Sequence, residues 1–509
     1  MSQTADLPKI RPLGTFEHFR AVLHDLGFHY NVALAAHYTH PNDELDRSDV
    51  YNALKGIIAR LPPLSVTIRG LEGNAPYLAR LPEIQLANIV RWVDRSDSDS
   101  SRDALLDEIL SEENSKGFDV QSLDPLWRIV VLTPSKPSDG RSDLDSGYDI
   151  IFVWHHAIGD GHSGLAVLYA ILDALNNPSL GSLPPGNVDS AARVDGTIPS
   201  VVCSSKDPAP ALESLLKMQP SLRKRVHRLS VSYLGDWSTK PVSKKWSGGF
   251  YANNAPIRTN IRHVRVPAQS LSGILTKCRN ERTSMTAFLQ TLIGNILFCQ
   301  YRDAERLMCA TAISLRRFIS PSNPKLDDMT MGMWVSAFHI EYSRPPSLAT
   351  SNAIDWSMTR KNKGRIDQEI AKGDKDIETG ALRDVGDFKK FLLDKIGKER
   401  ADSFAVTNLS VVKSHGLANA GSPTKKPSGW KISDVVFSQS CHVNGSAIQF
   451  CIISTENGDL VISLSSQEGI VALQDLETIA DQLKKDLIHI GHLNDLQTPK
   501  PDTRPATRQ

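Results

Sequence analysis

The segment that most constrains this chain lies at residues 148–172, YDIIFVWHHAIGDGHSGLAVLYAIL. An apolar run ends at His155 and His156. A turn with Gly159 and Gly161 follows, and a second apolar run then recurs at helical spacing. The first run predicts a buried strand, and the second predicts a helix with an apolar face. This strand–turn–helix unit therefore places two adjacent histidines at the end of a buried strand.

Helical and strand-like patterns alternate along the rest of the chain, as in α/β and α+β proteins. Apolar residues that recur every three or four positions predict helices, and short apolar runs bounded by turn residues predict strands. The sequence ENGD between two alternating runs predicts a hairpin. The predicted helices cover residues 15–26, 47–61, 102–116, 162–175, 268–279, 284–300 and 473–488, with a charged helical stretch at 355–401, and the predicted strands lie at 31–38, within 61–70, and at 126–132, 148–156, 262–266, 306–319, 331–342, 403–412, 430–440 and 446–468.

The length of 509 residues exceeds what one ordinary core supports, so two or more domains are expected. We divide the chain into an N-terminal lobe at 1–180, a crossover linker with a basic helix at 181–245, a C-terminal lobe at 246–495 and a disordered tail at 496–509. The linker region is rich in Pro, Gly, Ser and Asp. Its basic helix leaves two alternatives open, contact with a membrane surface or a solvated basic face.

Composition and charge narrow the classes of function. Hydrophobic residues make 40% and charged residues 23% of the chain, as in a soluble globular protein. The net charge of +1 gives no field that would hold a nucleic acid. The six cysteines form no C-x-x-C pair or zinc-spaced cluster, which favours reduced thiols. Because the N-terminus lacks the apolar core of a signal peptide and no apolar run reaches the roughly 18 residues of a spanning helix, we expect a cytoplasmic, monomeric protein without a transmembrane segment.

Three glycines offer a dinucleotide-binding interpretation. Gly159, Gly161 and Gly164 form G-x-G-x-x-G between a predicted strand and a predicted helix. That fold also needs a second parallel strand soon after the helix, ending in an acidic residue about 20 positions on. Here the helix runs into NNPSLGSLPPG instead. Two bulky histidines also precede the turn at which the backbone would have to approach a pyrophosphate, so the wider pattern disfavours this interpretation.

A metal site is a second interpretation of the same segment. His155, His156, Asp160 and His162 are all possible ligands by residue type. Neighbouring strand residues point to opposite faces, so the adjacent histidines cannot both face one ion without a bulge. No second cluster supplies further ligands. We therefore expect no metal.

General-base catalysis is the third interpretation, and a purely structural histidine pair is its alternative. The alternation of the strand sends one histidine towards a cleft and packs the other inward. Asp160 follows His156 by four residues, in a turn that Gly159 and Gly161 permit. Its carboxylate could cap the following helix or pair with a buried arginine. Either role would fix the turn without contact with a substrate.

The sequence HHAIGDG resembles the H-H-x-x-x-D-G signature of the acyltransferase superfamily with the chloramphenicol-acetyltransferase-like fold. This superfamily includes plant BAHD acyltransferases, condensation domains of peptide synthetases and fungal alcohol acetyltransferases. The N-terminal RPLGTFEHFRAVLHDLGFHYNVALAAHY resembles the fungal group in particular. Further segments resemble that family in its order, namely FDVQSLDPLWRIVVL, AISLRRFI, MGMWVSAFHIEY, TNLS and WKISDVVFSQS. The D-F-G-W-G motif of the plant enzymes is absent.

The resemblance implies an α/β fold of two similar lobes, with strands exchanged between them and a tunnel at their interface. It implies that His156 is the catalytic base. It also implies that Asp160 is structural and turns towards Arg316, while His155 and Gly161 support the site. No metal and no tightly bound cofactor would be required.

The activity implied is transfer of an acyl group, in particular acetyl, from acyl-CoA to a small-molecule alcohol such as a fungal secondary metabolite. Ser336, Asn408 and Ser410 are then candidates to stabilise the oxyanion, and Arg317 is a neighbour that could compete with Arg316. The alternatives are a condensation or transesterification enzyme that takes its donor from a carrier protein, an N-acyltransferase, and an inactive scaffold with the same fold.

Overall fold

β8 (Tyr148–His155) is the central strand of a five-stranded sheet in the first lobe. This computed structural model describes residues 7–73, 75–95, 100–134, 147–178, 199–219, 244–252, 257–319, 323, 326–346, 348, 350–416 and 429–492. The other strands of the sheet are β2 (Asn31–Thr39), β6 (Val90–Asp94), β7 (Trp127–Thr133) and β14 (Lys431–Gln439), in the order β14–β2–β8–β7–β6. β8 pairs antiparallel with both of its neighbours, β2 and β7.

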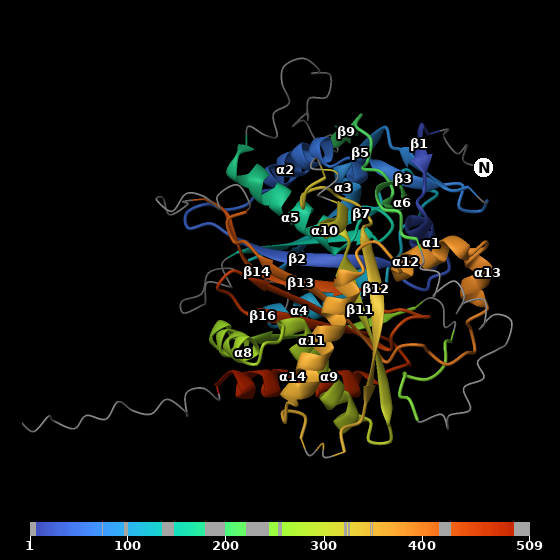
Figure 1. The fold of residues 1–509 in the computed structure, drawn as a ribbon. Coiled ribbons are helices and arrows are strands. Elements are labelled where there is room, and N and C mark those ends of the chain that lie inside the picture. Colours follow the sequence, from blue (N-terminus) through green and yellow to red (C-terminus); the bar gives the residue numbers. More distant parts are fainter. Residues whose placement is uncertain are drawn as a thin grey trace, which may run out of the picture.

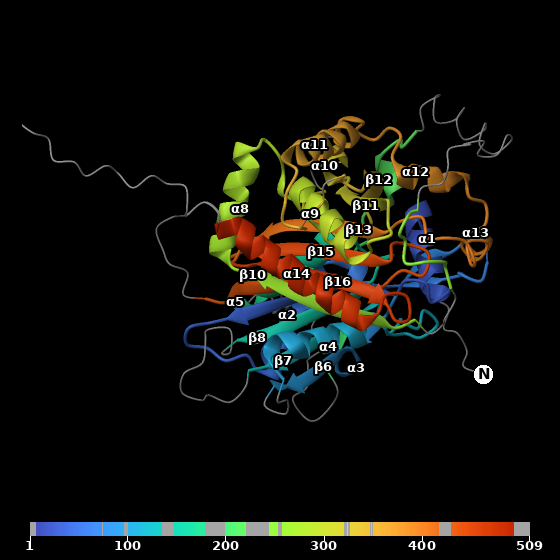
Figure 2. The ribbon, with the colours of Figure 1, turned by 90° about the horizontal axis from the view of Figure 1, so that it is seen from below.

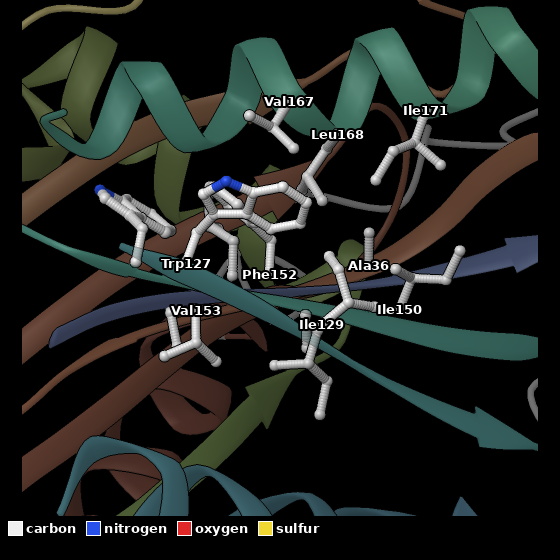
Figure 3. Close-up of a cluster of buried hydrophobic side chains, with 14 of the residues drawn as sticks. Ala36, Trp127, Ile129, Ile150, Phe152, Val153, Val167, Leu168 and Ile171 are labelled. Atoms are coloured by element: carbon white, nitrogen blue, oxygen red, sulfur yellow. The ribbon is translucent and has the colours of Figure 1, made fainter. Parts of the chain in front are cut away.

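Helices cover this sheet on both faces. α5 (Gly161–Asn176) and α2 (Arg47–Arg60) pack on each other above β2, and α4 (Arg102–Asn114) lies below it (Figure 1). Figure 3 shows Val167 and Leu168 of α5 above Phe152 of β8. Every residue of β8 is buried, which explains its continuous apolar run, because a strand covered on both faces has no polar alternation.

The second lobe is built on a six-stranded sheet in the order β10–β16–β15–β13–β11–β12. α8 (Ala268–Asn280), α9 (Met285–Gln300) and α14 (Leu473–His492) pack together on one side of it, seen from below in Figure 2. α11 (Trp356–Ala371) packs on α9. The strands are β10 (Thr259–Val266), β11 (Arg306–Ser314), β12 (Val335–Ser343), β13 (Phe404–Val412), β15 (Ile448–Thr455) and β16 (Leu460–Gln467).

The remaining elements are short, apart from α1 (Thr15–Asp25). β1, β3 and β4 form a three-stranded sheet, and β5 pairs with β9. These elements are β1 (Lys9–Pro12), β3 (Val66–Arg69), β4 (Tyr77–Arg80), β5 (Glu83–Gln85), β9 (Ser200–Val202), α3 (Leu86–Ile89), α6 (Leu212–Leu215), α10 (Arg316–Ile319), α12 (Glu378–Ala381), α13 (Phe388–Leu393) and the 3-10 turns Pro62–Ser65 and Leu382–Asp384.

β14 connects the two halves of the chain. Although it comes late in the sequence, it pairs along its length with β2 in the sheet of the first lobe. It also packs on β15 and β16 of the second sheet. This arrangement has the exchanged strand that the sequence resemblance implies.

Most of the predicted elements are confirmed to within a few residues, including the hairpin between β15 and β16 and Ser284 as the N-cap of α9. The continuous charged helix predicted at 355–401 is wrong. Gly373 and Asp376 adopt positive φ angles of 64° and 56°, which a right-handed helix cannot continue, so the stretch divides into α11, α12 and α13. The strand predicted at 306–319 ends at Ser314, and α10 follows.

Several predictions fall outside the described residues. These are the disordered tail, most of the crossover linker, and the basic helix beyond α6. The division of the chain at 180, 245 and 495 also stays a prediction. Among the described helices, none combines the length and the apolar character that a membrane crossing requires.

A buried ionic network joins the two lobes where β14 crosses. Nε of Arg102, on α4, donates a hydrogen bond to Asp149 of β8 at 2.9 Å, and its Nη1 donates to Asp434 of β14 at 2.9 Å. Arg265 of β10 donates to the other oxygen of Asp434 at 2.5 Å. The side chains of Arg102, Asp149 and Asp434 are almost fully buried. The exchanged strand is thereby tied to both lobes by charge, as well as to the first sheet by strand pairing.

We predict that Arg102→Met lowers the free energy of unfolding by about 3–5 kcal/mol, because it leaves the buried Asp149 without its arginine and removes one of the two arginines bound to Asp434. Urea denaturation measures this loss. Arg262→Met is the matched control, since it breaks the half-exposed pair with Glu477 on the surface and should cost no more than about 1 kcal/mol. Equal losses for the two variants would contradict the assigned importance of the network.

Candidate active site

A cavity of about 320 Å³ lies between the two lobes. His156, Asp160 and Gly161 reach it from the junction of β8 and α5. The opposite wall comes from the second lobe, with Ser336 of β12 and Thr407 of β13 among its residues. Phenylalanine and leucine side chains of α1 form an apolar part of the wall. A cavity lined by both lobes lies where the sequence resemblance implies a tunnel.

His156 follows directly after β8 and lines this cavity, with 8% of its surface exposed. Its Nδ1 lies 3.1 Å from the carbonyl oxygen of Gly159. Because a carbonyl oxygen only accepts, Nδ1 must carry the proton, which leaves Nε2 with a free lone pair. Nε2 makes no hydrogen bond with any described residue. The arrangement fixes the tautomer that a general base needs.

The environment keeps this imidazole neutral. Burial lowers the pKa of His156 well below its usual 6.5, and the nearby positive charge of Arg20 lowers it further. A histidine with a lowered pKa holds no proton at neutral pH. The ring can therefore accept a proton from a bound group.

His155 points to the other side of the strand, as the alternation predicts. It is fully buried, its Nδ1 accepts a hydrogen bond from the backbone N–H of Ala157 at 2.9 Å, and its ring lies 4.2 Å from that of His24. It does not line the cavity. Its contacts support the turn rather than reach a ligand.

Asp160 performs both of the roles considered for it. Its Oδ1 accepts the backbone N–H of Ser163 at 3.0 Å and so caps α5, and its Oδ2 lies 2.6 Å from Nη1 of Arg316. Oδ2 also accepts the backbone N–H of Trp334, whose ring lies under the Arg316 guanidinium at 4.9 Å. Arg316 is buried, whereas Arg317 is exposed and does not compete. The turn after His156 is thus anchored to the second lobe.

The two glycines of the turn serve close packing, not a special backbone angle. Neither Gly159 nor Gly161 has a positive φ, which corrects the expectation that conformational freedom explains them. A Cβ added at Gly161 would lie 2.6 Å from a methyl group of Leu409. A Cβ at Gly159 would lie 2.6 Å from that of Ser163. The space inside the turn at Gly159, and the space between the two lobes at Gly161, therefore require glycine.

The structure separates the three oxyanion candidates. Ser336 lines the cavity, and its Oγ accepts the backbone N–H of Thr379 at 3.2 Å, which leaves its hydroxyl hydrogen available. Asn408 and Ser410 do not line the cavity. They lie at an irregularity of β13, where Asn408 donates to Thr286 and accepts the backbone N–H of Ser410. Of the three residues, only Ser336 therefore remains a candidate to stabilise the oxyanion.

Three further residues complete the surroundings of His156. The ring of His29 lies 5.6 Å from that of His156 and stacks on His442 at 3.9 Å. Arg20 of α1 donates from Nη1 to Nε2 of His442 at 3.3 Å. No motif marks them, because they come from opposite ends of the chain. The sequence contains one indication of Arg20: this charged residue lies on the apolar stripe of α1, four residues after Phe16 and three before Leu23.

The described residues do not support the dinucleotide and metal interpretations. Both neighbours of β8 are antiparallel, so α5 is not a crossover between parallel strands. Within the part of the chain that the structure describes, no group of three His, Cys, Asp or Glu side chains is arranged to hold a metal ion.

We predict that Asp160→Ala lowers the free energy of unfolding by about 3–5 kcal/mol, because it leaves the buried Arg316 without its carboxylate. Thermal and urea unfolding measure the effect. Asp46→Ala is the matched control, because Asp46 caps α2 in the same way but pairs with no arginine, and its loss should cost about 1 kcal/mol. If both variants lost the same stability, Asp160 would be a cap and nothing more.

Comparisons with known proteins agree with this geometry. The family model described as alcohol acetyltransferase matches residues 12–487. Among curated proteins, the chain is 26% identical to the probable alcohol acetyltransferase crmB of Aspergillus fumigatus, over 90% of this chain and 95% of that protein. It is 25% identical to the probable alcohol acetyltransferase FCK4 of Fusarium pseudograminearum, over 96% of each.

Solved structures share the fold at low sequence identity. The TRI3 trichothecene 15-O-acetyltransferase of Fusarium sporotrichioides superposes with a TM-score of 0.62, at 12% identity, over 95% of both chains. The first condensation domain of the calcium-dependent antibiotic synthetase superposes with a TM-score of 0.60, at 12% identity, over 94% of this chain and 96% of that one. These matches confirm the predicted two-lobed α/β fold, and the family match covers nearly the whole sequence. The chain belongs to the alcohol acetyltransferase family of enzymes.

Proposed function

We propose that this enzyme transfers an acetyl group from acetyl-CoA to the hydroxyl of a small alcohol, with His156 as the general base. One observation carries the proposal: a neutral imidazole, with its proton fixed on Nδ1, has its Nε2 free at a cavity lined by both lobes. The cavity of about 320 Å³ suits a small molecule. The relative that acts on trichothecenes supports a secondary metabolite as the acceptor.

The chemistry follows from the free Nε2. An alcohol holds its proton too tightly at neutral pH to attack a thioester, and a base within hydrogen-bond distance removes that proton as the oxygen attacks, for a gain of about 10²–10⁴-fold. The attack forms the new C–O bond and places negative charge on the former carbonyl oxygen. Collapse of this intermediate breaks the C–S bond, and the imidazolium returns the proton to the departing CoA thiolate. The products are an acetate ester and CoA.

Ser336 is the proposed donor to the oxyanion. It lines the same cavity as His156, on β12 of the second lobe, and its hydrogen bond from the backbone N–H of Thr379 leaves the hydroxyl hydrogen free. A donor of this kind acts at about 3 Å from the developing charge. The mechanism uses acetyl-CoA as a co-substrate, without a covalent acyl-enzyme or a tightly bound cofactor.

A carrier-protein-dependent condensation enzyme is the second candidate, because condensation domains share this fold. It would use the same histidine with a phosphopantetheine arm as the donor. The alcohol acetyltransferase family match favours free CoA and a hydroxyl over a carrier protein or an amine. An inactive scaffold is disfavoured by the neutral, correctly protonated His156.

We predict that His156→Ala lowers kcat by about 10²–10⁴-fold, the contribution of a general base, and leaves the unfolding temperature close to that of the wild type. The assay mixes the protein with acetyl-CoA and a panel of primary, secondary and aromatic alcohols and amines, and follows thiol release. His489→Ala, at an exposed position of α14, should retain full activity.

The same assay tests the alternatives. Near-normal turnover by His156→Ala would remove the base role. Thiol release only with amines would favour N-acylation. Acetyl transfer only from an acetylated carrier protein would favour the condensation enzyme.

A further inference from the structure

Arg20 is a basic residue of this cavity that the proposed mechanism does not use. It lies on α1 between Phe16 and Leu23, and all three side chains line the cavity. Through His442 and His29 it belongs to the same cluster as His156. Its charge is therefore close to the reacting groups.

The half-buried guanidinium of Arg20 has only weak partners for its charge. Nη1 donates to the neutral ring of His442, and the planar group lies 5.0 Å from the ring of Phe16. Nε is enclosed without a hydrogen bond. Nη2 has no hydrogen bond with a described residue, and unlike Nε it retains accessible surface. Burial lowers the pKa of Arg20 to about 10, so it is still charged at neutral pH.

The other cations that line the cavity have carboxylates beside them. Nδ1 of His339 lies 2.8 Å from Asp402, and its Nε2 lies 3.0 Å from Glu378. Burial lowers the pKa of Lys395, and the same two carboxylates raise it. Among the described residues, no carboxylate pairs with Arg20 in this way. The wall near His156 thus carries an uncompensated positive charge.

An anion on the ligand would relieve two costs of this arrangement. A half-buried guanidinium without a counter-ion loses part of its hydration without compensation, and an anion that accepts from Nη2 would provide that compensation. The charge of Arg20 also disfavours the imidazolium that His156 must become during reaction. An anion bound beside Arg20 would offset that repulsion. Both effects require the anion to remain near the reaction centre.

We propose that Arg20 binds a carboxylate of the acceptor, so that the preferred acceptor is a hydroxycarboxylic acid. This inference rests on the proposed function of the same site. The planar guanidinium matches a carboxylate, and the phenylalanine and leucine side chains of α1 contact the apolar part of such a molecule. The phosphates of CoA are separated from its thioester by the uncharged pantetheine arm, so they do not supply an anion at this position.

The test compares hydroxycarboxylic acids with their methyl esters as acceptors for acetyl-CoA, using a series of linear and aromatic acids. For the preferred acid, the wild type should show a KM at least about 30-fold below that of its ester, the effect expected for one partner of a buried charged pair. Arg20→Met should abolish this acid-over-ester preference. Arg20→Lys should keep part of it, since an ammonium retains the charge without the planar fork. Arg279→Met, at an exposed position of α8, should retain the full preference.

Two outcomes would overturn the inference while the proposed function stands. One is turnover of the acids and esters with equal KM values by the wild type. The other is an equal fall of kcat on both acceptors in Arg20→Met, which would assign Arg20 to the oxyanion. If no acceptor supports thiol release, the proposed function fails. Calorimetric titration of the same acids into the wild type and Arg20→Met then decides the inference, since equal binding to both overturns it and a loss of binding in the variant supports it.

Discussion

The carbonyl group of Gly159 holds the candidate active site together. It accepts two hydrogen bonds, from Nε1 of the buried Trp154 at 2.9 Å and from Nδ1 of His156 at 3.1 Å. The first fixes the turn on the core of the first lobe, and the second fixes the orientation and tautomer of the histidine. The next residue, Asp160, pairs with Arg316 and so attaches the turn to the second lobe. The reactivity of one imidazole thus depends on a turn that both lobes hold in place.

The exchanged strand β14 contributes both to the junction between the lobes and to the wall of the cavity. Asp434, near its start, is tied to Arg102 and Arg265 in the ionic network. Phe437 and Gln439, near its end, line the cavity, and His442 follows shortly after. The lobes are therefore joined by the same strand that forms part of the space between them. A loosened junction would be expected to alter the cavity as well as the fold.

Local patterns of the sequence were sufficient for most helices and strands and for the placement of His156. The apolar run of β8 and the stripe of α5 are local signals, and the alternation of a strand separates His155 from His156. The role of Arg316 could be predicted only from the family resemblance, since nothing near it in the sequence specifies a partner 156 residues away. The sequence does not predict the positive φ angles at Gly373 and Asp376, because the stretch around them is rich in helix-forming residues. No local pattern predicts the contacts of His29, His442 and Arg20, because these contacts form only when the chain has folded.

The central claim is that His156 is neutral and acts as the base, and the pH dependence of kcat/KM tests it most directly. The base is active when unprotonated, and its pKa lies below the usual 6.5 because of burial and Arg20. The unprotonated fraction therefore remains high as the pH falls through 6.5, and the account predicts that kcat/KM stays constant there and declines only at lower pH. A decline of kcat/KM centred at or above pH 6.5 would contradict the account. A decline at lower pH that persists unchanged in His156→Ala would also contradict it, because that decline would belong to another group.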